Sequence, residues 1–150
     1  TLFRSFARRK PRTVGEVVDC LLELPEYRAS ARMQAGPAII VGGKENRAGN
    51  IMVDMTGGTE GPREVLEKLS AAGVGTIVAM HYSEKHKEEA EKQRINVIIA
   101  GHVVSDSLGM NLILDRLEEK GVGIIPVSGL VRVSRARKKG GPSGGARRRS

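Results

Sequence analysis

The stretch that decides the fold is residues 96–111, which read NVIIAGHVVSDSLGMN. Its first part, Val97 to Ala100, is a short apolar run that is typical of a buried β-strand, and Gly101 interrupts it. His102 follows the glycine directly, and Asp106 stands four positions later, where a helical pattern starts. In open α/β sheets, ligands bind beyond the carboxyl ends of the strands. A histidine and a carboxylate at this position therefore indicate a functional site.

The same succession of strand, loop and helix recurs along the chain. Apolar runs predict strands at 38–41, 51–54, 75–80, 96–100, 122–125 and 130–133, and amphipathic segments predict helices at 13–24, 26–34, 62–71, 84–93 and 106–120. Thr13 and Glu16 have the spacing of a capping box at the start of the first helix. We expect the strands at 38–41 and 51–54 to pair as neighbours. The alternation predicts an α/β fold in which three or more β-α units pack helices on a mixed, largely parallel sheet.

Positive charge is concentrated at the two ends of the chain. Of the 25 Lys and Arg residues, five lie in residues 1–12 and eight in residues 132–150, with no acid among them. All 17 acids lie in residues 13–131, whose net charge is −5, whereas the whole chain carries +8. We divide the chain into a basic amino-terminal segment (1–12), an α/β domain (13–134) and a disordered basic tail (135–150). The basic ends could bind nucleic acid non-specifically through phosphates, but aromatic residues that stack on bases are scarce.

Cysteine content and hydropathy narrow the class of protein further. Cys20 is the single cysteine, which excludes an intramolecular disulfide, and its apolar neighbours predict an ordinary buried thiol. No apolar run approaches the ~20 residues that span a bilayer, and no signal-peptide pattern is evident. We therefore expect a cytoplasmic protein without membrane contact.

Three loops are expected to meet at one edge of the sheet. If the β-α units are parallel, the loops at 55–61, 81–83 and 101–105 all emerge at the carboxyl ends of the strands. This edge would bring His102 and Asp106 together with residues that could line a pocket, namely Asp54, Thr56, Gly57, Gly58, Thr59 and His81. His86, among charged neighbours on the helix at 84–93, is expected on a solvated helix face.

Each of these features has a functional and a structural interpretation. His102 and Asp106 resemble a metal-ligand pair suited to zinc, manganese or iron. Alternatively, His102 caps a helix and Asp106 is an acid of its first turn. Gly57 and Gly58, between a strand and a helix, could cradle a phosphate, but the P-loop pattern is missing and a tight turn without any ligand explains them as well.

The run from Asp54 to Val133 resembles the carboxy-terminal half of the Nif-three-like dinuclear metal-centre proteins. The similarity covers roughly residues 13–134 and is carried by the AGHVVSDSLG and MTGGT segments. It is greatest for the longer bacterial and archaeal branch of the family. The resemblance implies an α/β fold, ring-shaped hexamers and a pair of metal ions in each subunit. Some members are labelled homologues of GTP cyclohydrolase type 2.

The family's metal site implies specific residues here. It combines a His-His pair and an Asp from the amino-terminal half with an H-x-x-x-E motif, which His102 and Asp106 match with Asp in place of Glu. No His-His pair exists in these 150 residues, so the chain offers a partial site for a divalent transition metal. We expect a fragment that lacks the first half, the alternative being a truncated protein with a broken site.

Two classes of function follow from these observations. The first is a metal-binding subunit that would act, if catalytic, as a metal-dependent, GTP cyclohydrolase-like hydrolase, with no catalytic residue assigned. The second is a non-catalytic homo-oligomeric assembly or partner-binding module, in which the sheet edge is purely structural.

Overall fold

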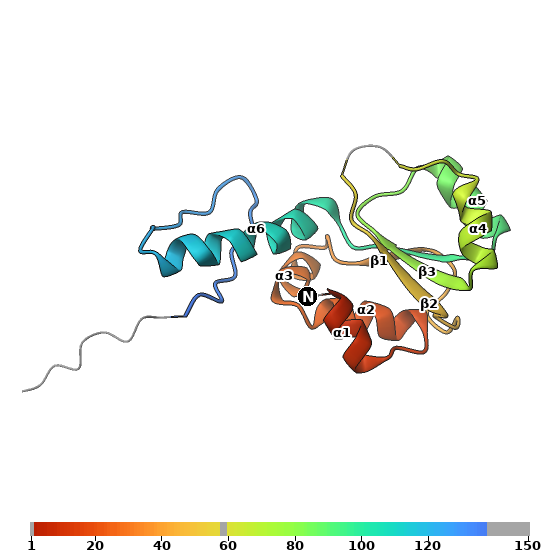
Figure 1. The fold of residues 1–150 in the computed structure, drawn as a ribbon, viewed down its shortest axis with the longest axis horizontal. Helices are drawn as coiled ribbons and strands as arrows, with labels where there is room; N and C mark the ends of the chain where they lie inside the picture. The colour runs from red at the N-terminus through yellow and green to blue at the C-terminus, as the bar shows by residue number, and fades with distance from the viewer. Residues whose placement is uncertain (1, 58–59, 138–150) are drawn as a thin grey trace, which may run out of the picture.

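The computed structural model describes residues 2–57 and 60–137 (Figure 1). Within these ranges the helices are α1 (Leu2–Arg9), α2 (Val14–Leu22), α3 (Pro25–Arg32), α4 (Val65–Ala71), α5 (Glu84–Lys92) and α6 (His102–Glu119). The strands are β1 (Ala38–Val41), β2 (Asn50–Asp54), β3 (Val74–Ala79) and β4 (Asn96–Ile99). None of the helices in these two ranges has both the length and the apolar character that crossing a membrane requires.

The four strands form one sheet in the order β1-β4-β3-β2. Strands β2, β3 and β4 are parallel, and β1 adds to β4 in the antiparallel direction. The predicted α/β fold with a mixed, largely parallel sheet is thereby confirmed. In the register of the parallel strands, Asp54 lies opposite Ala79, and Ala79 lies opposite Ile99. The carboxyl ends of the three strands are therefore level with one another.

The predicted pairing of β1 with β2 is wrong, because the two strands occupy opposite edges of the sheet. Their connection, residues 42–49, passes the amino-terminal ends of β3 and β4 instead of making a hairpin. Asn96 receives a hydrogen bond from Asn46 and donates to the Arg47 carbonyl, and Thr76 donates to the Ala48 carbonyl. These polar contacts provide hydrogen-bond donors for the backbone carbonyl groups of the connection. They hold the connection in place, so that β2 lies at the edge of the sheet opposite β1.

Helix α2 begins as the sequence predicts. The Thr13 hydroxyl accepts a hydrogen bond from the Glu16 backbone N–H, and the Glu16 carboxylate accepts one from the Thr13 N–H. This capping box satisfies backbone donors that the first helical turn leaves unpaired. Helix α2 then turns its apolar stripe toward the sheet, where Cys20 is buried, in agreement with the prediction of a buried thiol.

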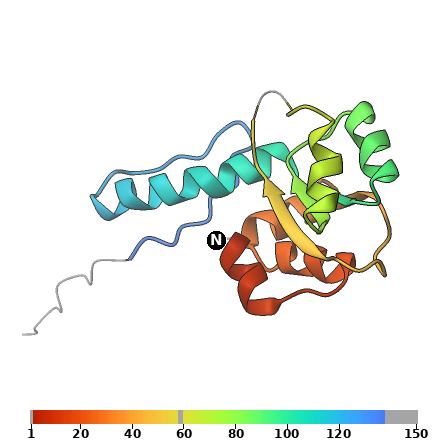
Figure 2. The same cartoon turned by 45° about the vertical axis from the view of Figure 1, so that its right-hand side comes forward.

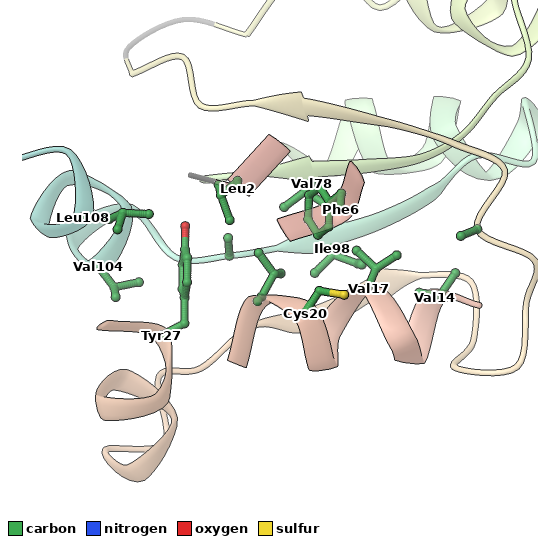
Figure 3. Packing of buried hydrophobic residues seen from close by; sticks show 13 residues of the cluster. Leu2, Phe6, Val14, Val17, Cys20, Tyr27, Val78, Ile98, Val104 and Leu108 are labelled. Atoms are coloured by element: carbon green, nitrogen blue, oxygen red, sulfur yellow. The ribbon is translucent and has the colours of Figure 1, made fainter. Parts of the chain in front are cut away.

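Helices cover both faces of the sheet. On one face, side chains from α1, α2, α3 and α6 pack on Val78 and Ile98 of the sheet (Figure 3). Leu2 and Phe6 join this core, so the basic amino-terminal segment docks on the domain through α1. On the other face, the core forms between α4, α5 and the sheet, with Leu66, Ala90 and Ile77 among its buried members.

Helix α6 starts at His102, four residues earlier than predicted, and extends away from the sheet (Figures 1 and 2). The chain then returns alongside α6, and the strands predicted at 122–125 and 130–133 are wrong, because residues 121–137 contain no strand. Side chains of α6 form hydrogen bonds with the backbone of the returning segment. Ser107 accepts a hydrogen bond from the Val131 N–H, and Asn111 donates one to the Val131 carbonyl. The long helix carries the segment out of reach of either sheet edge, so it has no strand to pair with.

Buried ionic contacts fasten the returning segment to the domain. Arg135 makes two hydrogen bonds to the fully buried carboxylate of Glu26, at 2.6 and 2.7 Å, and Asn111 donates a third at 2.8 Å. Arg132 pairs with Asp115 at 2.7 Å on the same side of α6. These contacts reach into the first residues of the predicted disordered tail, whose remaining residues, 138–150, lie outside the described ranges.

Candidate functional site

The candidate site lies where β2, β3 and β4 end together. The turn from β4 into α6 is made by Gly101, whose φ of +95° is a backbone conformation that residues with a side chain rarely adopt. A Cβ atom at this position would also lie 3.1 Å from the Cγ1 atom of Val104. The glycine thus allows α6 to start immediately beyond the strand, with His102 as its first residue.

His102 and Asp106 lie on the same face of α6, one turn apart. The His102 Nε2 atom is 3.4 Å from the Asp106 Oδ2 atom, and the two side chains are 46% and 64% exposed. The alternative in which Asp106 is a first-turn acid is wrong, because the helix starts four residues before it and its first turn contains no acid. The two side chains therefore form an exposed imidazole–carboxylate pair rather than parts of a helix cap.

The other loops bring a second histidine and a glycine to His102. The His81 ring, which follows β3, stacks on the His102 ring with centroids 5.5 Å apart and an interplanar angle of 22°. A Cβ atom at Gly57 would lie 3.8 Å from the His102 Nε2 atom, so the backbone after β2 also reaches this point. Gly58 and Thr59, the other expected pocket residues of this loop, lie outside the described ranges.

Glu60 connects the site to α5, a role that the sequence analysis did not assign. Its carboxylate lies 2.6 Å from the His86 Nδ1 atom and 3.6 Å from the His81 Nδ1 atom, and it accepts a hydrogen bond from the Ser83 backbone N–H. Burial alone would raise the pKa of Glu60, but the hydrogen bonds from Ser83 and the charge of His86 outweigh it and lower the pKa. Glu60 is thus held as an anion that ties the loop after β2 to the loop after β3.

His86 does not lie on a solvated helix face, and that prediction is wrong. Its side chain is only 14% exposed, and its Nε2 atom lies 2.7 Å from the Gly61 carbonyl oxygen. Both ring nitrogens face acceptors, because the Nδ1 atom faces Glu60. The sequence contained one usable signal: His86 falls in the first turn of the helix predicted at 84–93, and the first turn of a helix in a β-α unit faces the carboxyl edge of the sheet.

A pocket of about 140 Å³ lies between the loops and helix α4. Asp54, Thr56 and His81, which the sequence analysis expected in a pocket, line it together with Glu60, Tyr82 and His86. The apolar part of its wall consists of Met52, Val65, Leu66, Leu69 and Ile77, with Gly61 and Pro62 completing it. Burial, with the negative charges of Asp54 and Glu60, raises the pKa of Tyr82 to about 12.

The residues of this edge fit a divalent metal only in part. Two ligand atoms that share a tetrahedral ion at about 2.0–2.2 Å lie about 3.4 Å apart, which is the separation of the His102 and Asp106 atoms. Within residues 2–57 and 60–137, however, no group of three or more His, Cys, Asp or Glu side chains is arranged to hold a metal ion. The pair fits as part of a coordination shell and does not complete one.

Comparison with known proteins identifies the fold. No protein-family model matches the chain, and no curated protein matches it. The crystal structure of a NIF3 superfamily protein from Sphaerobacter thermophilus matches 86% of the chain with a TM-score of 0.70 and 29% sequence identity. The chain is a NIF3-like α/β protein. This match confirms the resemblance inferred from the AGHVVSDSLG and MTGGT segments.

The NIF3-like chain spans 46% of the length of the Sphaerobacter thermophilus protein. A Bacillus cereus protein related to NIF3 also matches, over 75% of this chain and 28% of that protein, with 14% identity and a TM-score of 0.45. On the match to the Sphaerobacter thermophilus protein, the chain corresponds to a partial NIF3-like domain.

Proposed function

We propose that the chain binds a divalent transition metal (zinc, manganese or iron) through the Nε2 atom of His102 and a carboxylate oxygen of Asp106. The observation that carries the proposal is the 3.4 Å separation of these two atoms on one turn of α6. Imidazole nitrogen and carboxylate oxygen are the donor types that these metals accept. The NIF3-like fold supports the same assignment, because the resemblance to dinuclear metal-centre proteins implies these two positions as ligands.

The neighbouring residues would orient the ligands. His81 stacks on the His102 ring and restricts its rotation, and the Glu60 carboxylate lies 3.6 Å from the His81 Nδ1 atom. Such outer contacts fix the orientation of metal-ligating histidines in proteins. A metal ion bound at this edge supplies Lewis-acid chemistry for hydrolysis. Since two ligands make an incomplete shell, the hydrolase-like activity requires further ligands from another polypeptide segment.

A metal titration tests this proposal. Zn²⁺ added to the chain, followed by isothermal titration calorimetry, should show one weak site that His102→Ala abolishes and Asp106→Asn weakens about tenfold or more. Asp19→Asn serves as the matched control, because Asp19 is an exposed acid on α2. Heats that are the same for wild-type protein and His102→Ala would end the proposal.

A second candidate function, assembly through α6, rests on a separate observation. His102, Asp106, Met110, Ile113 and Leu117 fall within about 80° of one another around the helix axis. The three apolar side chains of this stripe are 45%, 58% and 39% exposed. Exposed apolar stripes on helices mark surfaces that associate with other polypeptides, so the open metal-ligand pair continues into a surface suited to homo-oligomer formation.

The oligomeric state tests the second candidate. Light scattering coupled to size-exclusion chromatography should show an assembly that Ile113→Glu dissociates. Glu88→Gln, which changes an exposed side chain of α5 far from the stripe, is the control and should leave the mass unchanged. A monomeric wild-type protein at 100 µM, about the concentration at which weak interfaces fill, would rule out self-assembly through this face.

A further inference from the structure

The pocket beside the candidate metal ligands has a chemical character of its own. Residues of β2, β3, the loops that follow them, α4 and the first turn of α5 line it, and its volume of about 140 Å³ is close to that of the cavities that hold a benzene-sized ring. Met52, Leu66, Leu69 and Ile77 give it an apolar wall. A flat apolar body of one ring therefore fits its interior.

Two carboxylates and two histidines, His81 and His86, are the ionisable groups of the lining besides Tyr82. Asp54 and Glu60 contribute carboxylates, and no Lys or Arg belongs to the lining, in a chain whose overall charge is +8. Glu60 is engaged by Ser83 and His86, whereas Asp54 uses its Oδ1 atom to accept a hydrogen bond from the Thr56 N–H. Burial raises the pKa of Tyr82 to about 12, and the negative charges of Asp54 and Glu60 add to this shift.

We propose that this pocket binds a small organic cation with a flat apolar body, such as an amine or an amidine. The apolar wall would receive the ring, and the Asp54 and Glu60 carboxylates would accept N–H bonds from the cationic group. Tyr82 adds an aromatic ring to the wall, which favours a cation over a neutral group of the same shape. The chemistry of the wall therefore selects for charge as well as for shape.

The pocket lies beside the proposed metal site, but binding of a cation in the pocket does not require the metal. His81 is part of the pocket wall and stacks on His102, so a bound cation would lie one imidazole ring away from the candidate metal ligand. The proposal goes beyond metal binding, because the recognition groups belong to β2, the loop after it and the loop after β3. It can therefore be tested in the presence of a chelator.

The experiment compares benzamidine with benzamide, its neutral counterpart of nearly the same shape, at pH 8 with 1 mM EDTA. The chain has two tyrosines, two phenylalanines and no tryptophan, so its aromatic NMR signals are few. Benzamidine should shift the ring signals of Tyr82 and His86 in a saturable manner. Tyr27, which is fully buried in the core on the other face of the sheet, should not respond.

Variants distinguish binding of benzamidine in the pocket from binding elsewhere on the surface. Asp54→Asn retains an acceptor for the Thr56 N–H, and Glu60→Gln removes the second charge; each should weaken benzamidine binding about tenfold, the size of one lost charge-assisted hydrogen bond. Glu64→Gln, which removes an exposed carboxylate outside the lining, should leave binding unchanged. Equal shifts with benzamide, no saturation at 20 mM benzamidine, or full binding by the Asp54→Asn protein would each overturn the proposal, whatever the outcome of the zinc titration.

Discussion

Replacing Arg135 with alanine should destabilise the protein by about 3 kcal/mol. The Glu26 carboxylate is fully buried, and Arg135 donates two of the three side-chain hydrogen bonds that it accepts, the third coming from Asn111. Removing one partner of a buried ion pair costs about 3–5 kcal/mol, because the remaining charge is left without compensation. We expect the lower end of this range, since the Arg135 side chain is 33% exposed and solvent screens part of the interaction.

Urea denaturation followed by circular dichroism measures this loss. Arg116→Ala is the matched control, because Arg116 is 80% exposed and pairs with Glu119 on the surface of α6; its loss should not exceed about 1 kcal/mol. The double variant Glu26→Gln/Arg135→Ala should be more stable than Arg135→Ala alone, since it leaves no uncompensated charge in the core. Equal losses for Arg135→Ala and Arg116→Ala would refute the reasoning.

The pH dependence of the same pair has a definite sign. Burial opposes ionisation of Glu26, but the hydrogen bonds from Arg135 and Asn111 prevail and lower its pKa below the usual 4.5. A carboxyl group with a lowered pKa in the folded state contributes stability above its unfolded pKa and loses it as the pH falls through the folded value. The wild-type protein should therefore lose this contribution below about pH 4.5, and Arg135→Ala should not show the loss.

Three further predictions concern the ends of helices and the site. Thr13→Ala should cost about 1 kcal/mol in urea denaturation, because it removes the side-chain acceptor of the α2 capping box, and an unchanged midpoint would count against the cap. Gly101→Ala should cost about 1–3 kcal/mol, since it forces a residue with a Cβ atom to a φ of +95°, and a neutral effect would show that the turn before α6 relaxes freely. Glu60→Gln should lower the free energy of unfolding by about 2 kcal/mol at pH 7. Because the pKa of Glu60 is lowered in the folded state, the difference from wild type should disappear as the pH falls through this lowered pKa, and a constant difference would contradict the ionic role of Glu60.

Features that depend on neighbouring residues alone were predicted well from the sequence. The capping box at Thr13 is a local device, and the structure contains it. The apolar runs also located all four strands of the sheet to within a residue at most ends. Their success reflects the short range of the interactions involved: a cap, a turn or an alternating strand is decided within a few residues.

Features that depend on distant contacts were predicted less well. The order of strands is set by Asn96 and Thr76, which bind the connection between β1 and β2 from 28 or more residues away. The β-branched residues at 122–133 suggested strands, but an apolar pattern does not reveal whether a partner strand is within reach. A pattern of this kind predicts the capacity to pair and not the pairing itself.

The candidate site also combines features that the sequence predicts with contacts that it does not predict. His102 and His81 could be assigned to one sheet edge from topology alone, since parallel strands end on the same side. Glu60 and His86 could not be paired from the sequence, because their contact depends on how the loop after β2 folds over the start of α5.

Paramagnetic broadening by Mn²⁺ tests the central claim, that the His102–Asp106 pair on α6 is a metal-binding position, most directly. In two-dimensional amide spectra, substoichiometric Mn²⁺ should first broaden the signals of residues around the pair, including Gly57, His81, Gly101 and His102, which the structure brings together. His102→Ala should remove this localised effect. Broadening spread over exposed carboxylates such as those of α5, and unaltered in the His102→Ala protein, would contradict the account.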